Sequence, residues 1–477
     1  MTTEAPPADG AVRSLLGRGS VFTIATAVQM SVAVLVTPLV TRLLAPSEFG
    51  RVATAMVLLQ VLTYLVALGL PTAVTREYFD DKGGLSAARS LMAMSVSVSF
   101  VMALAIDLTG PLWARALFSG LPYGGALRIA VWATVPMSLV LASQALLRAT
   151  ERAGRFVVVT AISTGGGQLL GLSVALWIHA TAATYFTGLA AGLVVAGVVG
   201  VCFTGVDLSR LNDRRLLRAA FHVGIPTVPH AMAVYIVGVG DRVLVQRFEG
   251  LGPVARYQVA YLVGALGLTV AGALNNAWAP LIYGAGDQRR WQVLADTTGA
   301  LYRLAGVVVC GVALGAPIAL IAFAPSSYDP RALTPVCAVV ALSLVPFVGY
   351  LAEAHPIFYL RKVWSLAWAT PLAAAVNIGL NALLIPWIGL MGAAYTTVVT
   401  YTVQFLLARR VRRRLVAVPW RRGSAIQAWA IAGAGAAAGA LLPAGGAWLV
   451  VRAVAATAAA VVFVARLRGL LASHQPS

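Results

Sequence analysis

The chain has 477 residues, of which 60% are hydrophobic and 11% are charged, and its formal net charge at pH 7 is +19. Soluble domains carry roughly 25% charged residues, so this composition excludes a soluble globular protein and favours a chain that crosses a membrane many times. The basic residues lie in clusters between apolar segments and lack interleaved aromatic residues. This pattern excludes nucleic acid as a partner and matches the excess of Lys and Arg in the cytoplasmic loops of membrane proteins.

The chain begins with MTTEAPPADG, a polar and slightly acidic stretch without the basic start of a secretory signal. The apolar stretch from Val21 to Val40 is long enough to span a bilayer and has no small-residue cleavage pattern, so we expect it to be retained as the first helix. Apolar runs of about 20 residues, the length that crosses a hydrocarbon core, then recur along the whole chain. About fourteen transmembrane helices are predicted, at 20–40, 52–72, 90–110, 127–147, 156–178, 184–204, 219–240, 256–281, 303–324, 333–358, 364–386, 391–408, 425–443 and 447–466.

The Lys and Arg residues fall unevenly on the two sides of these helices. When the loops are assigned to alternate sides, 26 of the 35 Lys and Arg residues share the side of the N-terminus and nine lie on the other side. Since cytoplasmic loops carry the excess, both termini are expected in the cytoplasm. The sequence therefore predicts a multi-pass protein of the inner, cytoplasmic membrane.

Patterns of cofactor chemistry are missing from the sequence. The three cysteines, Cys202, Cys310 and Cys337, lie in apolar segments without metal-ligand spacing or partner histidines. There is no Gly-x-x-x-x-Gly-Lys phosphate loop and no cluster of His, Cys and acidic residues. We therefore expect no catalytic residues, no metal and no other cofactor.

Two distant segments of the chain resemble each other. TRLLAPSEFGRVATAMVLLQVLTYLVALGL (41–70) is similar to DRVLVQRFEGLGPVARYQVAYLVGALGL (241–268), with Arg42 matching Arg242. The copies are six helices apart, so they share one orientation and would be related by an axis along the membrane normal. Chance similarity between segments rich in Ala, Leu, Val and Gly is the alternative.

The predicted fold class is an all-α polytopic membrane protein with two six-helix lobes, related as a parallel pseudo-repeat, and two extra C-terminal helices. The expected parts are a cytoplasmic N-terminal segment (1–19), an N-lobe (20–204), a cytoplasmic linker (205–218), a C-lobe (219–408), a basic cytoplasmic loop (409–424), helices 13 and 14 (425–466) and a cytoplasmic tail (467–477).

Three stretches of this sequence resemble one transporter family. TRLLAPSEFGRVATAMVLLQVLTYLVALGLPTAVTREY (41–78) is similar to the N-terminal signature of bacterial oligosaccharide flippases, AAVNIGLNALLIPWIGLMGAAYTTVVTY (374–401) resembles their helix 11–12 hairpin, and Asp241-Arg242 resembles their helix 7–8 junction. This family is the polysaccharide-transporter branch of the multidrug/oligosaccharidyl-lipid/polysaccharide exporter superfamily. The resemblance covers most of helices 1 to 12.

The resemblance implies a flippase that moves a polyprenyl-diphosphate-linked oligosaccharide across the cytoplasmic membrane by alternating access, for the biosynthesis of cell-surface polysaccharide. It implies a central hydrophilic cavity between two lobes. The expected partners are the lipid-linked saccharide, membrane lipids, and the polymerase and glycosyltransferases of the same biosynthesis.

A diphosphate in a cavity of low dielectric needs fixed positive charge, and Arg supplies it with a planar fork of donors. The candidates for substrate binding are Arg42, Arg76, Arg242 and Arg303. The alternative is that each of these side chains only extends to a lipid head group, as most Arg near span ends do.

Uncharged polar side chains within the spans would be unsatisfied if they faced lipid. Gln29, Asn275 and Asn276 are therefore further candidates for contact with the substrate in a cavity. Hydrogen bonding between helices is the alternative, and we expect it for Asn377 and Asn381, which lie four residues apart on one helix face.

Acidic residues inside a membrane often mark ion pathways. The candidates for coupling are Glu353, together with the nearby His355, whose charge changes near neutral pH, and Asp241, which is able to pair with the adjacent Arg242. For Asp107 and Asp241, which lie near the predicted outer interface, we expect solvation by lipid head groups instead.

Two other functions compete with this one. A multidrug exporter of the same superfamily is the first, although its cation-coupled members usually carry an acidic residue in the core of the N-lobe and the first helix here has none. A membrane-embedded polysaccharide polymerase or ligase is the second, although such enzymes usually carry a large external loop and every external connection here is short.

Overall fold

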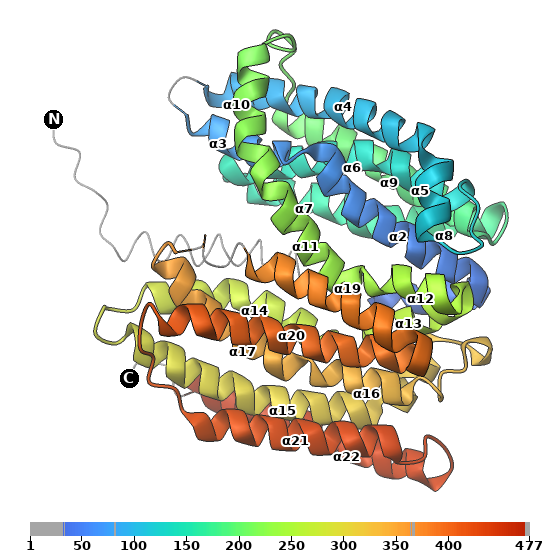
Figure 1. Ribbon diagram of the computed structural model, residues 1–477, viewed down its shortest axis with the longest axis vertical. Helices are drawn as coiled ribbons and strands as arrows, with labels where there is room; N and C mark the ends of the chain where they lie inside the picture. The colour runs from blue at the N-terminus through green and yellow to red at the C-terminus, as the bar shows by residue number, and fades with distance from the viewer. Residues whose placement is uncertain (1–31, 33, 81–82, 363, 365–367, 473–477) are drawn as a thin grey trace. The chain divides into compact units, whose positions relative to one another are not determined.

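The computed structural model describes all residues except 1–31, 33, 81–82, 363, 365–367 and 473–477. In that part of the chain every regular element is a helix (Figure 1), which confirms the all-α polytopic membrane fold. Twelve helical segments are long and apolar enough to cross a membrane, and the bent pair Leu251–Gly264 and Leu266–Asn276 forms a thirteenth if it is counted as one span. The predicted first span, 20–40, lies largely outside the described residues, which include an apolar helix at Val34–Leu43. The count of fourteen therefore stays a prediction.

The helices follow one another with short connections. In chain order they are α2 (Pro46–Ala67), α3 (Leu70–Tyr78), α4 (Gly84–Leu108), α5 (Gly110–Leu117), α6 (Gly125–Ala149), α7 (Ala153–Ala161), the π-helical η1 (Ile162–Gly166), α8 (Gly167–Trp177), α9 (Ala182–Thr204), α10 (Arg214–Gly224), the 3₁₀-helical η2 (Ile225–Thr227), α11 (Val228–Val239), α12 (Asp241–Glu249), α13 (Leu251–Gly264), α14 (Leu266–Tyr283), α15 (Arg290–Phe323), the 3₁₀-helical η3 (Ser326–Tyr328), α16 (Thr334–Leu342), α17 (Leu344–Tyr359), α19 (Ala369–Ile388), α20 (Leu390–Arg413), α21 (Arg422–Leu441) and α22 (Ala447–Ala472).

Packing divides the chain into two compact units. Among the described residues, the first unit consists of those up to 36, of 58–112 and of 123–229, and the second of 37–57, 113–122 and those from 230 onward. Two short segments, 37–57 and 113–122, thus belong to the second unit although they lie within the predicted N-lobe, 20–204. The predicted lobe boundaries follow the order of the helices and stay a prediction.

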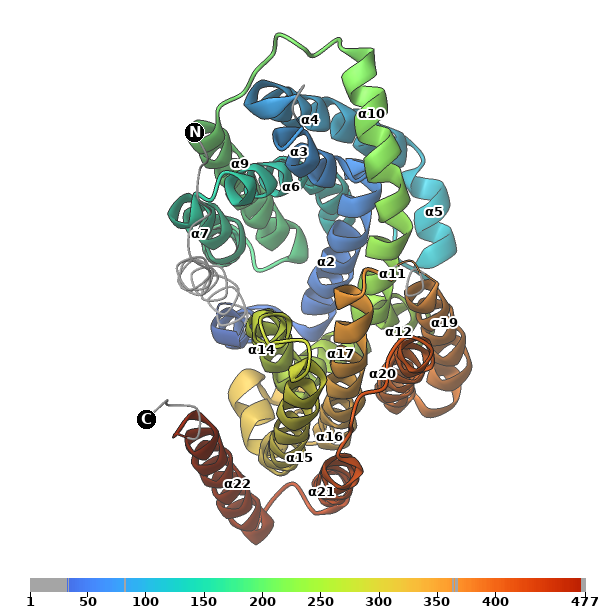
Figure 2. The same cartoon turned by 90° about the vertical axis from the view of Figure 1, so that its left-hand side faces the viewer.

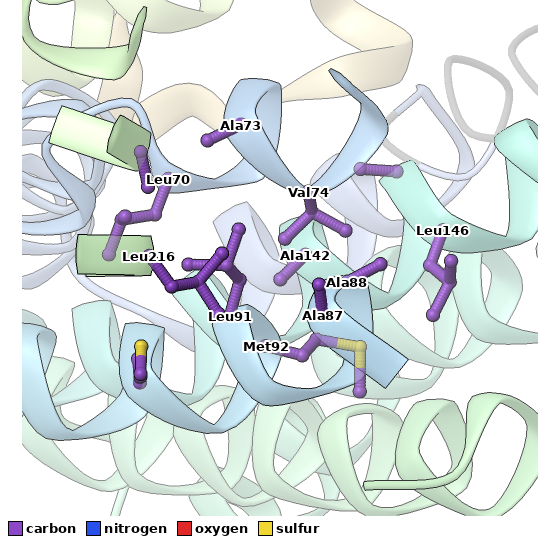
Figure 3. Packing of buried hydrophobic residues seen from close by; sticks show 13 residues of the cluster. Leu70, Ala73, Val74, Ala87, Ala88, Leu91, Met92, Ala142, Leu146 and Leu216 are labelled. Carbon is purple, nitrogen blue, oxygen red and sulfur yellow. The ribbon is translucent and has the colours of Figure 1, made fainter. Parts of the chain in front are cut away.

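The core of the first unit joins α3, α4, α6 and α10. Leu70 and Val74 of α3 pack on Leu91 of α4, on Leu146 of α6 and on Leu216 of α10 (Figure 3). Lipid tails are as apolar as these side chains, so close van der Waals packing rather than exclusion from water holds such helices together in a membrane.

The predicted second span, 52–72, is interrupted. α2 ends at Ala67, and α3 begins at Leu70 after Gly69, which has a left-handed backbone (φ 71°). A Cβ at Gly69 would lie 2.2 Å from the carbonyl oxygen of Gly224. The Leu-Gly-Leu sequence of the resemblance is therefore a helix break against which the end of α10 packs.

Small residues bring α8 and α9 close together. A Cβ at Gly188 would lie 2.4 Å from the carbonyl oxygen of Leu170, and one at Gly192 would lie 2.4 Å from the Cα of Gly167. The glycines of these two helices thus serve packing within the chain, as is typical of small residues in membrane helices.

We expect Gly192→Val to destabilise the first unit by about 1–3 kcal/mol, because the added methyl groups would overlap the backbone of Gly167 and force α8 and α9 apart. The free energy of unfolding in an SDS titration of the purified protein measures this loss. Gly154→Ala is the matched control, because a Cβ at Gly154 meets nothing within 4 Å. Equal stability of the Gly192 variant and the wild type would show that α8 and α9 tolerate separation.

The second unit is organised around α15. This helix lies beside α21 and α22, while α17 and α19 both pack on α20 (Figures 1 and 2). α15 begins at Arg290, well before the predicted start at 303, because its first turns are polar and continue beyond the apolar span. The predicted hydrogen bond between helices is confirmed for Asn377, whose Nδ2 atom donates to Thr400 Oγ1 of α20 at 3.1 Å. For Asn381 the prediction is wrong, since its Nδ2 atom donates to Asn377 Oδ1 within α19 at 3.1 Å.

Candidate functional site

A buried ion pair lies at the start of α12 in the second unit. Asp241 and Arg242 are each 2% exposed. The Arg242 guanidinium donates through Nη1 to Asp241 Oδ1 at 2.6 Å and to the carbonyl of Gly238 at 2.9 Å, and through Nε to Gln258 Oε1 at 3.0 Å. The predicted ability of Asp241 to pair with Arg242 is therefore confirmed, and head-group solvation does not describe Asp241.

Three tyrosines surround this pair. Tyr257 donates its hydroxyl proton to Asp241 Oδ2 at 2.6 Å, and the Arg242 guanidinium carbon lies 4.1 Å from the ring centroid of Tyr261. Tyr401 of α20 lies close to Tyr261. A charge in a low-dielectric interior must be paired and hydrogen-bonded. The ion pair and the tyrosines around it form a polar cluster that links α12, α13 and α20.

The cluster changes what Arg242 offers to a substrate. In this structure the positive charge of Arg242 is compensated by Asp241, so an incoming diphosphate would have to compete with that carboxylate. The tyrosines and Gln258 were missed by sequence reasoning. A usable signal was present, because Tyr257, Gln258 and Tyr261 are at the i, i+1 and i+4 positions of one helix near a charged pair.

Arg42 has a different role in the described conformation. Its exposed side chain donates to the carbonyls of Pro38 at 2.9 Å and of Ala322 at 3.0 Å, and the neighbouring Thr41 Oγ1 donates to the carbonyl of Phe323 at 2.6 Å. Ala322 and Phe323 are the last residues of α15, whose final carbonyls have no partners within the helix. Arg42 thus caps the C-terminal end of α15.

The two segments that resemble each other in sequence also meet in the second unit. A Cβ at Gly50 would lie 2.0 Å from the carbonyl oxygen of Leu251, directly after the matching Gly250. On the same side of the segment, the Tyr328 hydroxyl donates to the carbonyl of Leu44 at 2.8 Å. The start of α2 is therefore held against the start of α13 and against η3.

A second contact of this kind involves the segment 113–122. Gln246 Nε2 donates to the carbonyl of Ser119 at 2.9 Å, and Arg247 donates to the carbonyl of Ala116. Both donors belong to α12. α12 and the segment 113–122 are thus held together by side chains that bind backbone carbonyls.

We expect Gly50→Val to weaken the contact between the start of α2 and the start of α13 by about 1–3 kcal/mol, because the new side chain would overlap the backbone of Leu251. Such a cost corresponds to a roughly 5- to 150-fold shift between conformations with and without the contact. Double electron–electron resonance measures the distance between spin labels at Ser47 and Glu249. The fraction of molecules with longer distances should rise in the variant. Gly252→Val is the control, since a Cβ at Gly252 meets nothing within 4 Å, and identical distance distributions for both variants would contradict the role of Gly50.

Asn275 and Asn276 lie in α14, the second half of the bent span. The axes of the two halves differ by 50°. The Asn275 Oδ1 atom is buried without a hydrogen-bond partner among the described residues, whereas Asn276 is exposed. Broken helices with unsatisfied polar groups are typical of substrate sites in transporters, so contact of these residues with the substrate stays a prediction.

The two candidates for coupling in α17 have separate partners. Glu353 is 3% exposed and receives two hydrogen bonds from Arg412 of α20, at 2.5 Å from Nε and 3.1 Å from Nη2. His355 is 4% exposed; its Nδ1 atom lies 3.3 Å from the Tyr283 hydroxyl and its Nε2 atom has no partner among the described residues. Glu353 and His355 do not share a hydrogen bond in the described structure.

The remaining candidates are Arg76, Arg303 and Gln29. Arg76 is exposed in the last turn of α3, in the first unit, and Arg303 is half-buried in α15. Gln29 lies outside the described residues. Their binding roles stay predictions.

Asp107 corrects one expectation. It is 6% exposed, Arg128 donates to both of its carboxylate oxygens at 2.9 to 3.2 Å, and Tyr123 donates to Oδ1 at 2.5 Å. Lipid head groups are therefore not what satisfies Asp107. The chain itself supplies the partners from α6 and from the connection before it.

Comparison with protein families identifies one match. The family model described as "Polysaccharide biosynthesis protein" matches residues 16–284, which is more than half of the chain. A comparison with curated protein sequences found no match.

Several solved structures share this fold. The lipid II flippase MurJ in an inward closed conformation has a TM-score of 0.71 at 13% identity, over 94% of this chain and 99% of that one. An inward-facing multidrug resistance MATE family transporter of the MOP superfamily has a TM-score of 0.64 at 15% identity, over 82% of this chain and 97% of that one. A MOP superfamily transporter from Pyrococcus furiosus has a TM-score of 0.57 at 16% identity, over 83% of this chain and 95% of that one. The chain therefore has the fold of MOP superfamily transporters.

Proposed function

This chain belongs to the polysaccharide biosynthesis protein family, and from that membership we propose that it is a flippase for a saccharide linked to a polyprenyl diphosphate. The observation that carries the proposal is the family match in a chain with the fold of MOP superfamily transporters. A lipid-linked saccharide has a large polar head that must cross the hydrocarbon core, which is costly without a protein that shields it. The protein would act as a transporter rather than as an enzyme.

The closure at the end of the second unit supports alternating access. Gly50, Arg42 and Tyr328 hold the start of α2 and the preceding helix against α13, α15 and η3. Since the Lys and Arg distribution places this end outside the cell, the described conformation is one in which these outer ends are fastened. Release of the contacts, which are few and made to single carbonyls, would be required for the saccharide to leave.

The proposed location is the inner, cytoplasmic membrane with both termini inside. Lipid-linked precursors of surface polymers are built from soluble activated sugars, so the loaded carrier starts in the leaflet that faces those sugars. The polymerase and glycosyltransferases that extend the saccharide are proposed partners.

Reconstitution tests the proposal directly. The full-length protein in liposomes should expose a polyprenyl-diphosphate saccharide, loaded on the inside, to an externally added lectin without added nucleotide. In cells, deletion of the gene should remove a surface polysaccharide and leave the lipid-linked intermediate in the inner leaflet, and the wild-type gene should restore both. A deletion strain with normal polymer and no accumulated intermediate would contradict the proposal.

A multidrug exporter is the second candidate, because a multidrug resistance transporter shares the fold. At 15% identity that likeness concerns the fold alone. Dye efflux from a host that lacks its own pumps separates the two functions: the flippase should leave dye retention unchanged, and the exporter should lower it.

A further inference from the structure

A cavity of about 650 Å³ lies within the second unit, away from the Asp241 and Arg242 cluster. It is lined by the first third of α15, the second half of α17, the last turns of α20 and the start of α21. The chain enters or leaves the bundle at this end of all four helices. The Lys and Arg distribution assigns this end to the cytoplasm.

Four guanidinium groups and one carboxylate line the cavity. Arg412 is 4% exposed and holds Glu353 through two hydrogen bonds, so the carboxylate is turned toward a cation of the same wall. Arg421 Nη2 lies 2.8 Å from Asp296 Oδ1 at the rim. Two of the four arginines are thus matched by acids.

The other two arginines, Arg409 and Arg413, make no hydrogen bond or ion pair within the part of the chain that the structure describes. Four positive charges and two negative ones leave a net charge of +2 at this cavity. Arg409 is half-buried and Arg413 is exposed. The cavity therefore holds an excess of positive charge that an anion would compensate.

Two buried donors on the cavity wall lack acceptors. The Arg409 Nε atom and the Trp420 Nε1 atom are both inaccessible and have no hydrogen-bond partner among the described residues. Both groups are donors only. An Arg that only extends to the membrane surface keeps its guanidinium in water, whereas Arg409 is half-buried with its Nε covered. Because neither atom is accessible to water in this structure, neither can bind an anion in the cavity without a movement of its side chain, and the terminal nitrogens of Arg409 and Arg413 are the donors left for it.

We propose that this cavity is a binding site for a phosphoryl anion, held by the guanidinium groups of Arg409 and Arg413. Arg forks match the oxygen atoms of phosphate in geometry and in charge, and the volume lies within the usual range of small-molecule sites, about 300–1,000 Å³, so the phosphoryl group can carry an organic substituent. Two sources present this chemistry at a membrane surface: the head group of an acidic phospholipid and a soluble phosphorylated compound. The site goes beyond the proposed transport function, since the phosphoryl anion would bind at one end of the second unit whichever substrate the protein transports.

The basic end of α20 offers a matched pair of variants. Arg409 and Arg413 line the cavity and are four residues apart. Arg410 and Arg414 are also four residues apart and exposed, but they are not among the residues that line it. Replacing either pair by Gln removes two charges from the same helix end, so nonspecific electrostatic attraction falls equally in both.

Binding to the delipidated full-length protein in detergent is then measured in two arms. Native mass spectrometry counts bound phosphatidylglycerol against phosphatidylcholine, and calorimetry measures the affinity for pyrophosphate. Loss of the charge-assisted hydrogen bonds in Arg409→Gln/Arg413→Gln should lower affinity by about tenfold or more in at least one arm, while Arg410→Gln/Arg414→Gln should change it by less than about twofold.

The two arms identify the source. A loss confined to phosphatidylglycerol assigns the site to a lipid head group, and a loss confined to pyrophosphate assigns it to a soluble compound. Equal losses in the two double variants, or no binding by the wild type in either arm, overturn the proposal. Thermal unfolding of each variant shows that the fold is kept, and because neither arm measures transport, failure of the proposed flippase function would be seen separately.

Discussion

Replacing Asp241 by Asn is expected to destabilise the protein by about 3–5 kcal/mol, because the variant leaves the Arg242 guanidinium buried without a counter-ion. Arg242 would keep its hydrogen bonds to Gln258 and Gly238, and Tyr257 could still donate to the Asn oxygen. Those neutral contacts do not offset the loss of the carboxylate in a low-dielectric interior. An SDS titration of the purified protein measures the loss of free energy of unfolding.

Two further variants show whether the unpaired charge is the cause. Asp241→Asn with Arg242→Gln removes both charges and should recover most of the stability, since the neutral pair carries no buried ion. Asp296→Asn breaks the exposed ion pair with Arg421; the Asp296 side chain is 44% exposed and that of Arg421 is 62% exposed. This variant should lose less than about 1 kcal/mol of stability. A double variant that is no more stable than Asp241→Asn alone would show that side-chain packing, and not charge, holds this region.

The helices were largely predictable because the bilayer imposes one length and one composition on every span. Predicted spans such as 127–147 and 447–466 agree with α6 and α22 to within a few residues where the structure describes a span. The errors fall where a helix continues beyond the apolar span or breaks within it, as the predicted span 52–72 does at Gly69. α15 begins at Arg290, which is 7% exposed because it pairs with Asp287 and stacks on the Tyr359 ring.

The candidate site was less predictable because its partners lie far apart in the chain. Hydropathy identified Arg42 and Arg242 as charges at span ends, but it carried no information about the acceptors, which are a helix end near Ala322 and the carboxylate of Asp241. The adjacent acid was the available signal for Arg242. Nothing in the sequence marked the carbonyl of Ala322, since every helix end has such groups.

The cationic cavity could be recognised from the spacing of its arginines, although not from composition alone. Arg409, Arg412 and Arg413 recur at i, i+3 and i+4, which places them on one face of α20, whereas Arg410 and Arg414 fall on another. An intramembrane acid also needs a partner, but the sequence suggested only the nearby His355 for Glu353, and the structure supplies Arg412 instead. Which arginine would pair depended on how α17 packs on α20, and that is a tertiary property.

Replacing Glu353 by Gln is expected to cost about 3–5 kcal/mol of stability, for the same reason as at Asp241: Arg412 is 4% exposed and would lose its counter-ion. Arg412 keeps a bond to the carbonyl of Val416 and its contact with the Trp420 ring, neither of which supplies negative charge. The midpoint of an SDS titration, compared with that of wild type, measures the loss.

The paired variant Glu353→Leu/Arg412→Met separates a structural ion pair from a coupling residue. If the pair only holds α17 against α20, two apolar side chains of similar size should restore stability to within about 1 kcal/mol of wild type or better, and flipping in liposomes should persist at any proton gradient. If Glu353 exchanges a proton during the cycle, the stable double variant should instead lose the dependence of flipping on the gradient. The bidentate geometry of the Arg412 pair favours the first result, since an acid held by two donors at 2.5 and 3.1 Å releases its partner only when α17 and α20 separate.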